Sequence, residues 1–299
     1  MLVGVAERDL STTVLGQPRP HPLVTAPMAF QKLAHPEGEL ALARAAATTE
    51  TTLTLATLAN TAHAEMSGAL PGASRWFQLY VFRDRGVTDA MMASAVEHGF
   101  EAVVLTVDLP VAGLRESDVS LGWTLPPDLS VPALEAAGGA TELTFADALN
   151  TVDPALEWSD LEELAAGPLP VIVKGILRPD DAERAIEHGA AAIVVSNHGG
   201  RQLDTVLSTA EALVPIVEAV EGRVDVLVDG GIRRGTDVVK AIALGASAVL
   251  VGRPLLWGLA AGGEAGARRV IELLLEDLDR SLALLGEPAL SGVGAGVLA

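Results

Sequence analysis

Short apolar runs recur along the chain, and each is preceded or followed by a longer segment with helical periodicity. The pattern is clearest in three segments that resemble one another, at 95–108, 185–198 and 241–254. In each, a helix-like pattern ends at a glycine suited to the left-handed C-cap, and a run rich in β-branched residues follows. Runs that are apolar on both faces are typical of parallel strands buried within a sheet.

Further runs of this kind bring the number of expected strands to eight; they lie at 22–28, 53–58, 76–81, 170–176 and 224–231. Helical patterns are expected at 38–49, 62–70, 89–99, 158–167, 179–189, 208–220, 235–245 and 265–285. Eight alternations of strand and helix predict an α/β fold, a parallel (β/α)8 TIM barrel that forms a single domain over residues 1–299. A doubly wound open sheet is the alternative, but no G-x-G-x-x-G follows the first expected strand.

One connection breaks this rhythm. Residues 109–157 separate the fourth expected strand from its helix. A loop of this length in a compact barrel is usually functional or disordered. We therefore expect 109–157 to form an active-site lid.

Composition excludes several classes of protein. The net charge of −19 disfavours binding to a nucleic-acid backbone, and the absence of cysteine excludes disulfides and thiolate metal sites. The N-terminus does not resemble a signal peptide, and no apolar stretch reaches the ~18 residues of a membrane span. A cytoplasmic protein without a membrane or nucleic-acid partner is expected.

Polar and charged residues stand at the ends of the expected strands. In a (β/α)8 barrel, side chains at the carboxyl ends of the strands face the active site. The candidates are Pro27, Met28, Ala29, Gln78, Tyr80, Thr106, Asp108, Arg115, Lys174, Ser196, His198, Arg201, Asp229, Gly231, Arg233, Gly252 and Arg253. Such groups are costly inside apolar strands unless they are used, so their recurrence predicts a functional site.

Elementary chemistry suggests roles for some of them. The segments DGGIRRG and VGRP follow the last two strands, where glycines and arginines suit a phosphorylated ligand. His198 is the natural general base, and Asp108 could stabilise its imidazolium form. The guanidinium group of Arg201 is suited to bind a carboxylate through two parallel hydrogen bonds. Because the chain has no cysteine and no evident metal site, a bound cofactor must carry electrons if a small carboxylate is oxidised.

The motifs together resemble those of the FMN-dependent 2-hydroxy acid oxidases and dehydrogenases, a family that includes glycolate, lactate, mandelate and hydroxymandelate oxidases. The similar stretches are SNHGGRQLD, APMAFQKLAHPEGE, WFQLYVFRDRG, LTVDLPVAGLRESDV, VIVKGI and LVDGGIRRGTDVVKAIALGASAVLVGRP. The similarity is collinear from an N-terminal hairpin to the last helix. It implies FMN as cofactor, a small 2-hydroxy acid and oxygen as reactants, and a possible homo-tetramer.

The resemblance also implies roles for the candidate residues. His198 would take up a proton as the hydroxyl-bearing carbon is oxidised, with Asp108 as its partner. Arg201 and Arg115 would bind the substrate carboxylate, and Tyr80 its hydroxyl. Lys174 would lie near the N1–C2 carbonyl edge of the flavin. The remaining cofactor contacts would come from backbone at Pro27, Met28 and Ala29, from Gln78, Thr106 and Ser196 at the ring or ribityl chain, and from Asp229, Gly231, Arg233, Gly252 and Arg253 at the ribityl chain and phosphate.

This chain departs from the family pattern in two ways. The family usually has a further N-terminal helical segment with a second substrate-binding tyrosine, whereas this chain starts at the hairpin and contains one tyrosine, Tyr80. We therefore expect weaker carboxylate binding or a less well covered barrel bottom. The family often has Ser where this chain has Ala56, which would remove one hydrogen bond to the flavin.

The expected reaction is oxidation of a 2-hydroxy acid to a 2-oxo acid, with oxygen reduced to hydrogen peroxide. The residues near the pocket favour aromatic substrates such as mandelate or 4-hydroxymandelate. The alternatives are a lactate oxidase or dehydrogenase of the same family, a flavin-binding protein with impaired activity, and a flavin-dependent isomerase. Among the other histidines, His21 and His63 are expected at the surface.

Overall fold

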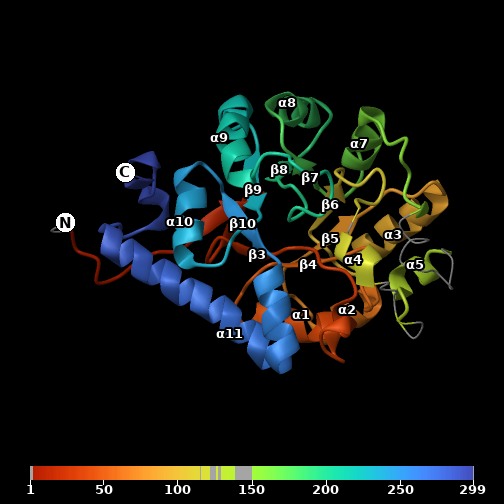
Figure 1. Cartoon of the computed structure of the whole chain (residues 1–299), viewed down its shortest axis with the longest axis horizontal. Coiled ribbons are helices and arrows are strands. Elements are labelled where there is room, and N and C mark those ends of the chain that lie inside the picture. The colour runs from red at the N-terminus through yellow and green to blue at the C-terminus, as the bar shows by residue number, and fades with distance from the viewer. Residues whose placement is uncertain (1–2, 115, 122–125, 127–128, 139–149, 299) are drawn as a thin grey trace.

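The strands of the protein form a closed barrel in the computed structural model, which describes residues 3–114, 116–121, 126, 129–138 and 150–298 (Figure 1). The eight parallel strands are β3 (Leu23–Thr25), β4 (Leu53–Leu55), β5 (Arg75–Leu79), β6 (Ala102–Thr106), β7 (Val171–Ile176), β8 (Ala192–Val195), β9 (Asp225–Asp229) and β10 (Ala248–Val251). They lie in the order β3-β10-β9-β8-β7-β6-β5-β4. A parallel bridge between Val24 and Thr52 then joins β3 to the start of β4. The ring is therefore closed, and the predicted (β/α)8 barrel is confirmed.

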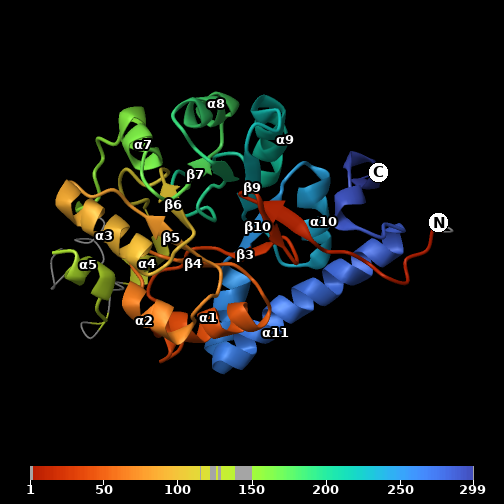
Figure 2. The same ribbon diagram turned by 180° about the vertical axis from the view of Figure 1, so that it is seen from behind.

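Helices surround the ring on the outside (Figures 1 and 2). They are α1 (Gly38–Thr48), α2 (His63–Ala69), α3 (Arg85–Glu97), α7 (Trp158–Ala165), α8 (Pro179–Glu187), α9 (Thr209–Val220), α10 (Gly235–Ala243) and α11 (Arg253–Leu285). Two shorter helices, α4 (Glu116–Leu121) and α5 (Pro132–Ala136), lie between β6 and α7. Helix α3 begins four residues before the expected start because the Asp84 side chain accepts a hydrogen bond from Gly86 N.

The last helix is longer than the sequence pattern indicates. The pattern predicts a helix over 265–285, but α11 already begins at Arg253 and has non-helical backbone at Gly262 and Gly263. Its two parts touch closely, since a Cβ atom on Gly266 would lie 2.0 Å from Gly258 O. Proline and glycine are common in this stretch and usually indicate a break in a helix, so the sequence pattern did not predict the first part of α11. No helix in the described part of the chain is both long enough and apolar enough to cross a membrane.

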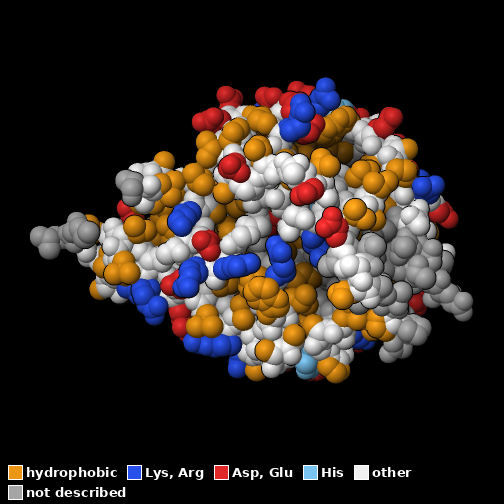
Figure 3. Space-filling model, viewed as in Figure 1, with side chains coloured by type: hydrophobic (Ala, Val, Ile, Leu, Met, Phe, Trp, Pro, Cys, Tyr) orange, Lys and Arg blue, Asp and Glu red, His pale blue; other side chains and the backbone are white. Residues whose placement is uncertain are grey.

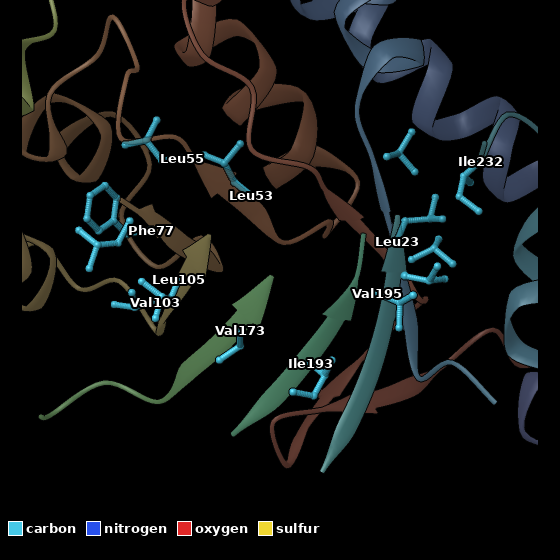
Figure 4. Packing of buried hydrophobic residues seen from close by; sticks show 14 of the residues in the cluster. Leu23, Leu53, Leu55, Phe77, Val103, Leu105, Val173, Ile193, Val195 and Ile232 are labelled. Atoms are coloured by element: carbon cyan, nitrogen blue, oxygen red, sulfur yellow. The ribbon is translucent and has the colours of Figure 1, made fainter. Parts of the chain in front are cut away.

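Two separate layers of apolar side chains stabilise the barrel. Alternate residues of each strand point inward and outward. Trp76, Val104 and Ile172 belong to the cluster inside the ring, whereas the neighbouring residues Phe77 and Val173 belong to the larger cluster between strands and helices. Figure 4 shows part of this outer cluster, in which Val103 and Leu105 lie between Phe77 and Val173. The inner layer fills the middle of the barrel.

A hairpin closes the amino end of the barrel. It consists of β1 (Thr12–Val14) and β2 (Gln17–Arg19), which pair antiparallel. The side chain of Val14 is 1% exposed and belongs to the inner cluster. Leu15 N donates a hydrogen bond to Asp225 Oδ2 at 2.7 Å and fixes the turn to the strand β9. The hairpin lies toward the viewer in Figure 2, so Figure 1 looks onto the carboxyl ends of the strands.

The expectation that His21 and His63 lie at the surface is wrong. His63 is 2% exposed and His21 is 6% exposed. The ring of His63 packs edge-on to Phe77, with ring centroids 4.5 Å apart, and also contacts Phe100. His21 lies just before β3, whereas His63 is the first residue of α2, and contacts with residues distant in the chain bury His63.

Candidate active site

A cavity of about 450 Å³ opens at the carboxyl end of the barrel. Fourteen of the seventeen residues expected at a site line it, namely Pro27, Met28, Ala29, Gln78, Tyr80, Thr106, Lys174, His198, Arg201, Asp229, Gly231, Arg233, Gly252 and Arg253. Asp108 and Ser196 do not line the cavity and lie directly behind residues that do. Arg115 falls outside the described residues. The site residues predicted from scattered strand ends therefore converge on one place.

His198 and Asp108 form a hydrogen-bonded pair at the wall of this cavity. His198 Nδ1 lies 2.9 Å from Asp108 Oδ1, and both side chains are largely buried. The backbone of His198 is left-handed, with φ of 56°, and its N–H donates to Ser196 Oγ at 3.1 Å. When Nδ1–H donates to the carboxylate, Nε2 carries the lone pair. The pair is thus built to accept a proton at Nε2 and to stabilise the resulting positive charge.

Gly175 makes room for this pair. A Cβ atom at Gly175 would lie 2.7 Å from Asp108 Cβ, and the residue has a φ of 116°. The register between β7 and β8 also shifts between Lys174 and Ile176. A glycine inside an otherwise β-branched strand often marks a bulge or a close approach of another group. That signal is present in VIVKGI, although Gly175 is not among the residues predicted for the site.

Lys174, Ser196 and Asp229 form a buried polar network beside the histidine. Ser196 Oγ donates to Asp229 Oδ2 at 2.8 Å, and Lys174 Nζ donates to Ser196 Oγ at 2.9 Å. Lys174 Nζ also lies 3.3 Å from Asp229 Oδ2. Pairing offsets the cost of burying both charges. The ammonium group is consequently held in a fixed position within the barrel.

Several buried polar atoms of residues that line the cavity lack a hydrogen-bond partner among the described residues. They are Gln78 Nε2, Thr106 Oγ1 and Asp229 Oδ1. Buried polar groups are normally hydrogen-bonded, so these atoms are candidates to bond a ligand in the cavity. They comprise an amide donor, a hydroxyl and a carboxylate acceptor. A ring system with carbonyl and N–H groups, joined to a polyhydroxyl chain, would satisfy all three kinds, and the flavin and ribityl parts of FMN have these groups.

Arginine side chains and glycine residues line the side of the cavity that is formed by the residues following β9 and β10. Arg233 and Arg253 are exposed there, and neither forms an ion pair with a carboxylate in the described part of the chain. Arg253 Nη2 donates to Gly199 O at 3.2 Å. A Cβ atom at Gly231 would meet nothing within 4 Å. Figure 3 shows basic side chains near the middle of this face, although the whole chain carries a net charge of −19. This side suits a phosphate group.

Thr57 and Gln202 form hydrogen bonds to residues of the site, although the sequence predicted no role for either. Thr57 N donates to Gln78 Oε1 at 3.2 Å, and Thr57 Oγ1 accepts from Tyr80 N at 3.1 Å. Gln202 Nε2 donates to the backbone oxygen of Asp108 at 2.9 Å. Gln202 lies inside the SNHGGRQLD motif, but nothing in the sequence pairs it with the segment after β6. These contacts are tertiary and have no local sequence signal.

The segment between β6 and α7 contributes apolar residues to the cavity. Leu109 and Leu121 line it, together with Leu33 and Leu58 from other loops. Part of the expected lid at 109–157 lies outside the described residues, at 115, 122–125, 127–128 and 139–149. The lid therefore stays a prediction.

Comparisons with known proteins give a consistent result. A family model described as FMN-dependent dehydrogenase matches residues 1–299. L-lactate oxidase of Nostoc sp. is 52% identical over 300 residues, which cover 96% of this chain and 81% of that protein. 2-Hydroxyacid oxidase 1 of Homo sapiens is 45% identical over 296 residues, covering 96% and 80% respectively. A structure of mandelate oxidase with (S)-4-hydroxymandelic acid matches with a TM-score of 0.91 and 41% identity, covering 98% and 84%.

Proposed function

Because the chain belongs to the family of FMN-dependent dehydrogenases and 2-hydroxy acid oxidases, we propose that it oxidises a 2-hydroxy acid with an apolar substituent to the 2-oxo acid. The protein is an oxidoreductase and its cofactor is FMN. In the proposed reaction the substrate loses two electrons and two protons, and oxygen takes them up as hydrogen peroxide. The observation that carries the proposal is the His198–Asp108 pair, in which His198 lines the same cavity as Lys174 and Arg201.

We assign the polar wall of the cavity to the cofactor. Gln78, Thr106 and Lys174 would face the flavin ring or ribityl chain, where the partnerless atoms Gln78 Nε2 and Thr106 Oγ1 support the assignment. Backbone at Pro27, Met28 and Ala29 would lie against the ring, Ser196 would orient Lys174, and Asp229, Gly231, Arg233, Gly252 and Arg253 would hold the ribityl chain and phosphate. FMN, when bound, accepts the two electrons that leave the substrate.

The residues assigned to the substrate have distinct tasks. Arg201 would bind the carboxylate through its fork of N–H donors. Tyr80 would hydrogen-bond the substrate hydroxyl. His198 Nε2 would take up one proton as the hydroxyl-bearing carbon is oxidised, and Asp108 would stabilise the imidazolium that results. Because His198 and Arg201 lie on the same short loop, their relative position is fixed when the substrate binds.

Apolar side chains around the cavity favour a large substituent on the substrate. Met28, Leu33, Leu58, Leu109 and Leu121 line it. They support an aromatic 2-hydroxy acid such as mandelate or 4-hydroxymandelate. A second candidate is L-lactate, which the 52% identity to an L-lactate oxidase favours. The paired His198 and Asp108 argue against a flavoprotein with impaired activity.

Steady-state assays would separate these candidates. We expect oxygen uptake and hydrogen peroxide formation with (S)-mandelate, and a kcat/KM for (S)-mandelate at least about tenfold above that for L-lactate or glycolate. A higher kcat/KM for L-lactate would replace the aromatic substrate with the second candidate. Turnover only with an artificial electron acceptor would replace the oxidase with a dehydrogenase. The cytoplasmic location and the homo-tetramer expected from the sequence stay predictions.

A further inference from the structure

Glu39 is a buried carboxylate outside the cavity that joins two of the loops lining it. It lies in the first turn of α1 and is 0% exposed. Its Oε1 atom accepts hydrogen bonds from Gln31 N at 3.1 Å and from Asn60 N at 3.0 Å. Its Oε2 atom accepts one from Thr61 Oγ1 at 3.2 Å. None of these three donors is a cation, and burying a carboxylate without a cationic partner is costly. The cost of burying Glu39 therefore indicates that its carboxylate has a specific role in the protein.

The first of the two loops, between β3 and α1, forms one wall of the cavity. Met28 and Phe30 line the cavity. Phe30 has a left-handed backbone with φ of 53°, a conformation that is strained for a bulky residue and persists only where the surroundings hold it. The next residue is Gln31, whose backbone N–H is held by Glu39 and whose side chain donates to Met28 O at 3.2 Å.

The second loop, between β4 and α2, donates to the same carboxylate and also lines the cavity. Leu58 lines the cavity and its backbone oxygen accepts from Phe30 N at 3.1 Å. Two residues later, Asn60 N donates to Glu39. The Asn60 side chain accepts from Lys32 N at 3.2 Å and donates to Ser130 O at 2.8 Å. The network thus reaches the segment between β6 and α7 as well.

We propose that Glu39 is a positioning residue, whose carboxylate fixes the β3–α1 and β4–α2 loops relative to one another and so sets the wall against which FMN binds. One oxygen atom, Oε1, accepts from both loops, so neither amide can move without disturbing the other. The inference rests on the proposed placement of the flavin ring against Met28 and its neighbours. Glu39 itself touches neither substrate nor cofactor.

The test compares Glu39→Gln, Glu39→Asp and Glu39→Ala with a control in the same turn, Glu37→Ala. Glu37 is the last residue of the β3–α1 loop, but its carboxylate pairs with Arg44 at the surface and bonds neither Gln31 nor Asn60. Release of FMN from each holoenzyme is followed by the recovery of free-flavin fluorescence, and the visible circular dichroism reports the environment of the ring. A glutamine keeps the shape and the acceptor oxygen, whereas an aspartate keeps the charge but cannot reach both amides.

We expect the Kd for FMN to rise at least about tenfold in Glu39→Ala and Glu39→Asp, because two buried amides lose their acceptor. The flavin dichroism should change in the same two variants. Glu39→Gln and Glu37→Ala should stay within about threefold of the wild type and keep its spectrum. If Glu39→Ala does not fold, the contrast between aspartate and glutamine carries the test.

Three results would overturn the inference. They are a wild-type Kd and spectrum in Glu39→Asp, a loss in Glu39→Gln as large as in Glu39→Asp, and a lowered melting temperature with unchanged FMN binding. The last result would leave Glu39 a purely structural role. A wild-type protein that binds no FMN would instead refute the proposed function.

Discussion

His198 Nδ1 lies 2.9 Å from Asp108 Oδ1, although 90 residues separate them in the chain. Asp108 follows β6 and His198 follows β8, with β7 between them in the ring. The contact crosses β7 at Gly175, where no side chain intervenes. The geometry of the His198–Asp108 pair therefore depends on β7 as well as on β6 and β8.

Asp108→Asn should leave FMN binding intact and slow the reaction. The amide can still orient the imidazole but cannot balance its positive charge, so we expect the rate of flavin reduction by substrate to fall by roughly 10²–10⁴-fold. Anaerobic stopped-flow absorbance measures this rate. Asp204→Asn, an exposed change in the loop after β8, is the control and should behave as the wild type. An unchanged rate in Asp108→Asn would remove the carboxylate from the proposed mechanism.

Gly175→Ala should damage the same pair indirectly. Its Cβ would lie 2.7 Å from Asp108 Cβ, at a φ of 116°, so the aspartate must move. Gly222→Ala is a matched control, because Gly222 has a φ of 70° but open space around its Cβ position. Each variant bears a backbone cost of about 1 kcal/mol in unfolding free energy. Only Gly175→Ala should also lower kcat, by at least about tenfold, and equal kcat values in the two would contradict the crowding argument.

Lys174→Met should make the bound flavin harder to reduce. The ammonium is fixed by Ser196 and Asp229 inside the barrel, and its positive charge would favour the more electron-rich, reduced form of the cofactor. We expect the midpoint potential of the bound flavin to fall by at least about 30 mV, equal to about 1.4 kcal/mol for a two-electron couple. A redox titration with a reference dye measures it. Lys240→Met, an exposed change on α10, should leave the potential unchanged, and an unchanged potential in Lys174→Met would place the ammonium away from the ring.

Stability should fall in mild acid because of His63. Burial lowers the pKa of His63 from 6.5 to about 4, with a smaller contribution from the nearby His98. Between these two pH values the unfolded chain binds a proton that the folded chain does not, so the free energy of unfolding decreases as the pH falls below 6.5. The loss amounts to about 2 kcal/mol at pH 5.

Urea unfolding at pH 7 and pH 5 measures this loss, with His63→Asn as the reference because it does not titrate. The wild type should lose about 2 kcal/mol more than the variant between the two pH values. His21, whose pKa is also lowered by burial, contributes equally to both proteins. The same pH dependence in both proteins would show that His63 does not stay neutral in the folded state.

The barrel was predictable because its signals are local. Glycine ends a helix and a β-branched run follows, and each such unit can be recognised within about a dozen residues. Candidate site residues were predictable for the same reason, since each stands directly after a strand and the fold brings strand ends together. His198, Lys174 and Gln78 were found from these positions.

Other features depend on contacts between distant segments. The burial of His63 results from Phe77 and Phe100. The role of Gly175 depends on Asp108, and that of Glu39 on amides in two loops. The first part of α11 packs against its second part at Gly258 and Gly266, so its glycines promote a close contact where the pattern indicated an interruption. None of these pairings leaves a periodic pattern in the sequence.

The most direct test is an anaerobic titration of the wild-type holoenzyme and of His198→Ala with (S)-mandelate, followed at the visible absorption band of the flavin. We predict that the wild-type band bleaches and returns when air is admitted, and that His198→Ala retains the flavin but its band does not bleach. A wild-type band that stays unchanged with (S)-mandelate, L-lactate and glycolate, or bleaching of His198→Ala at the wild-type rate, would contradict this prediction.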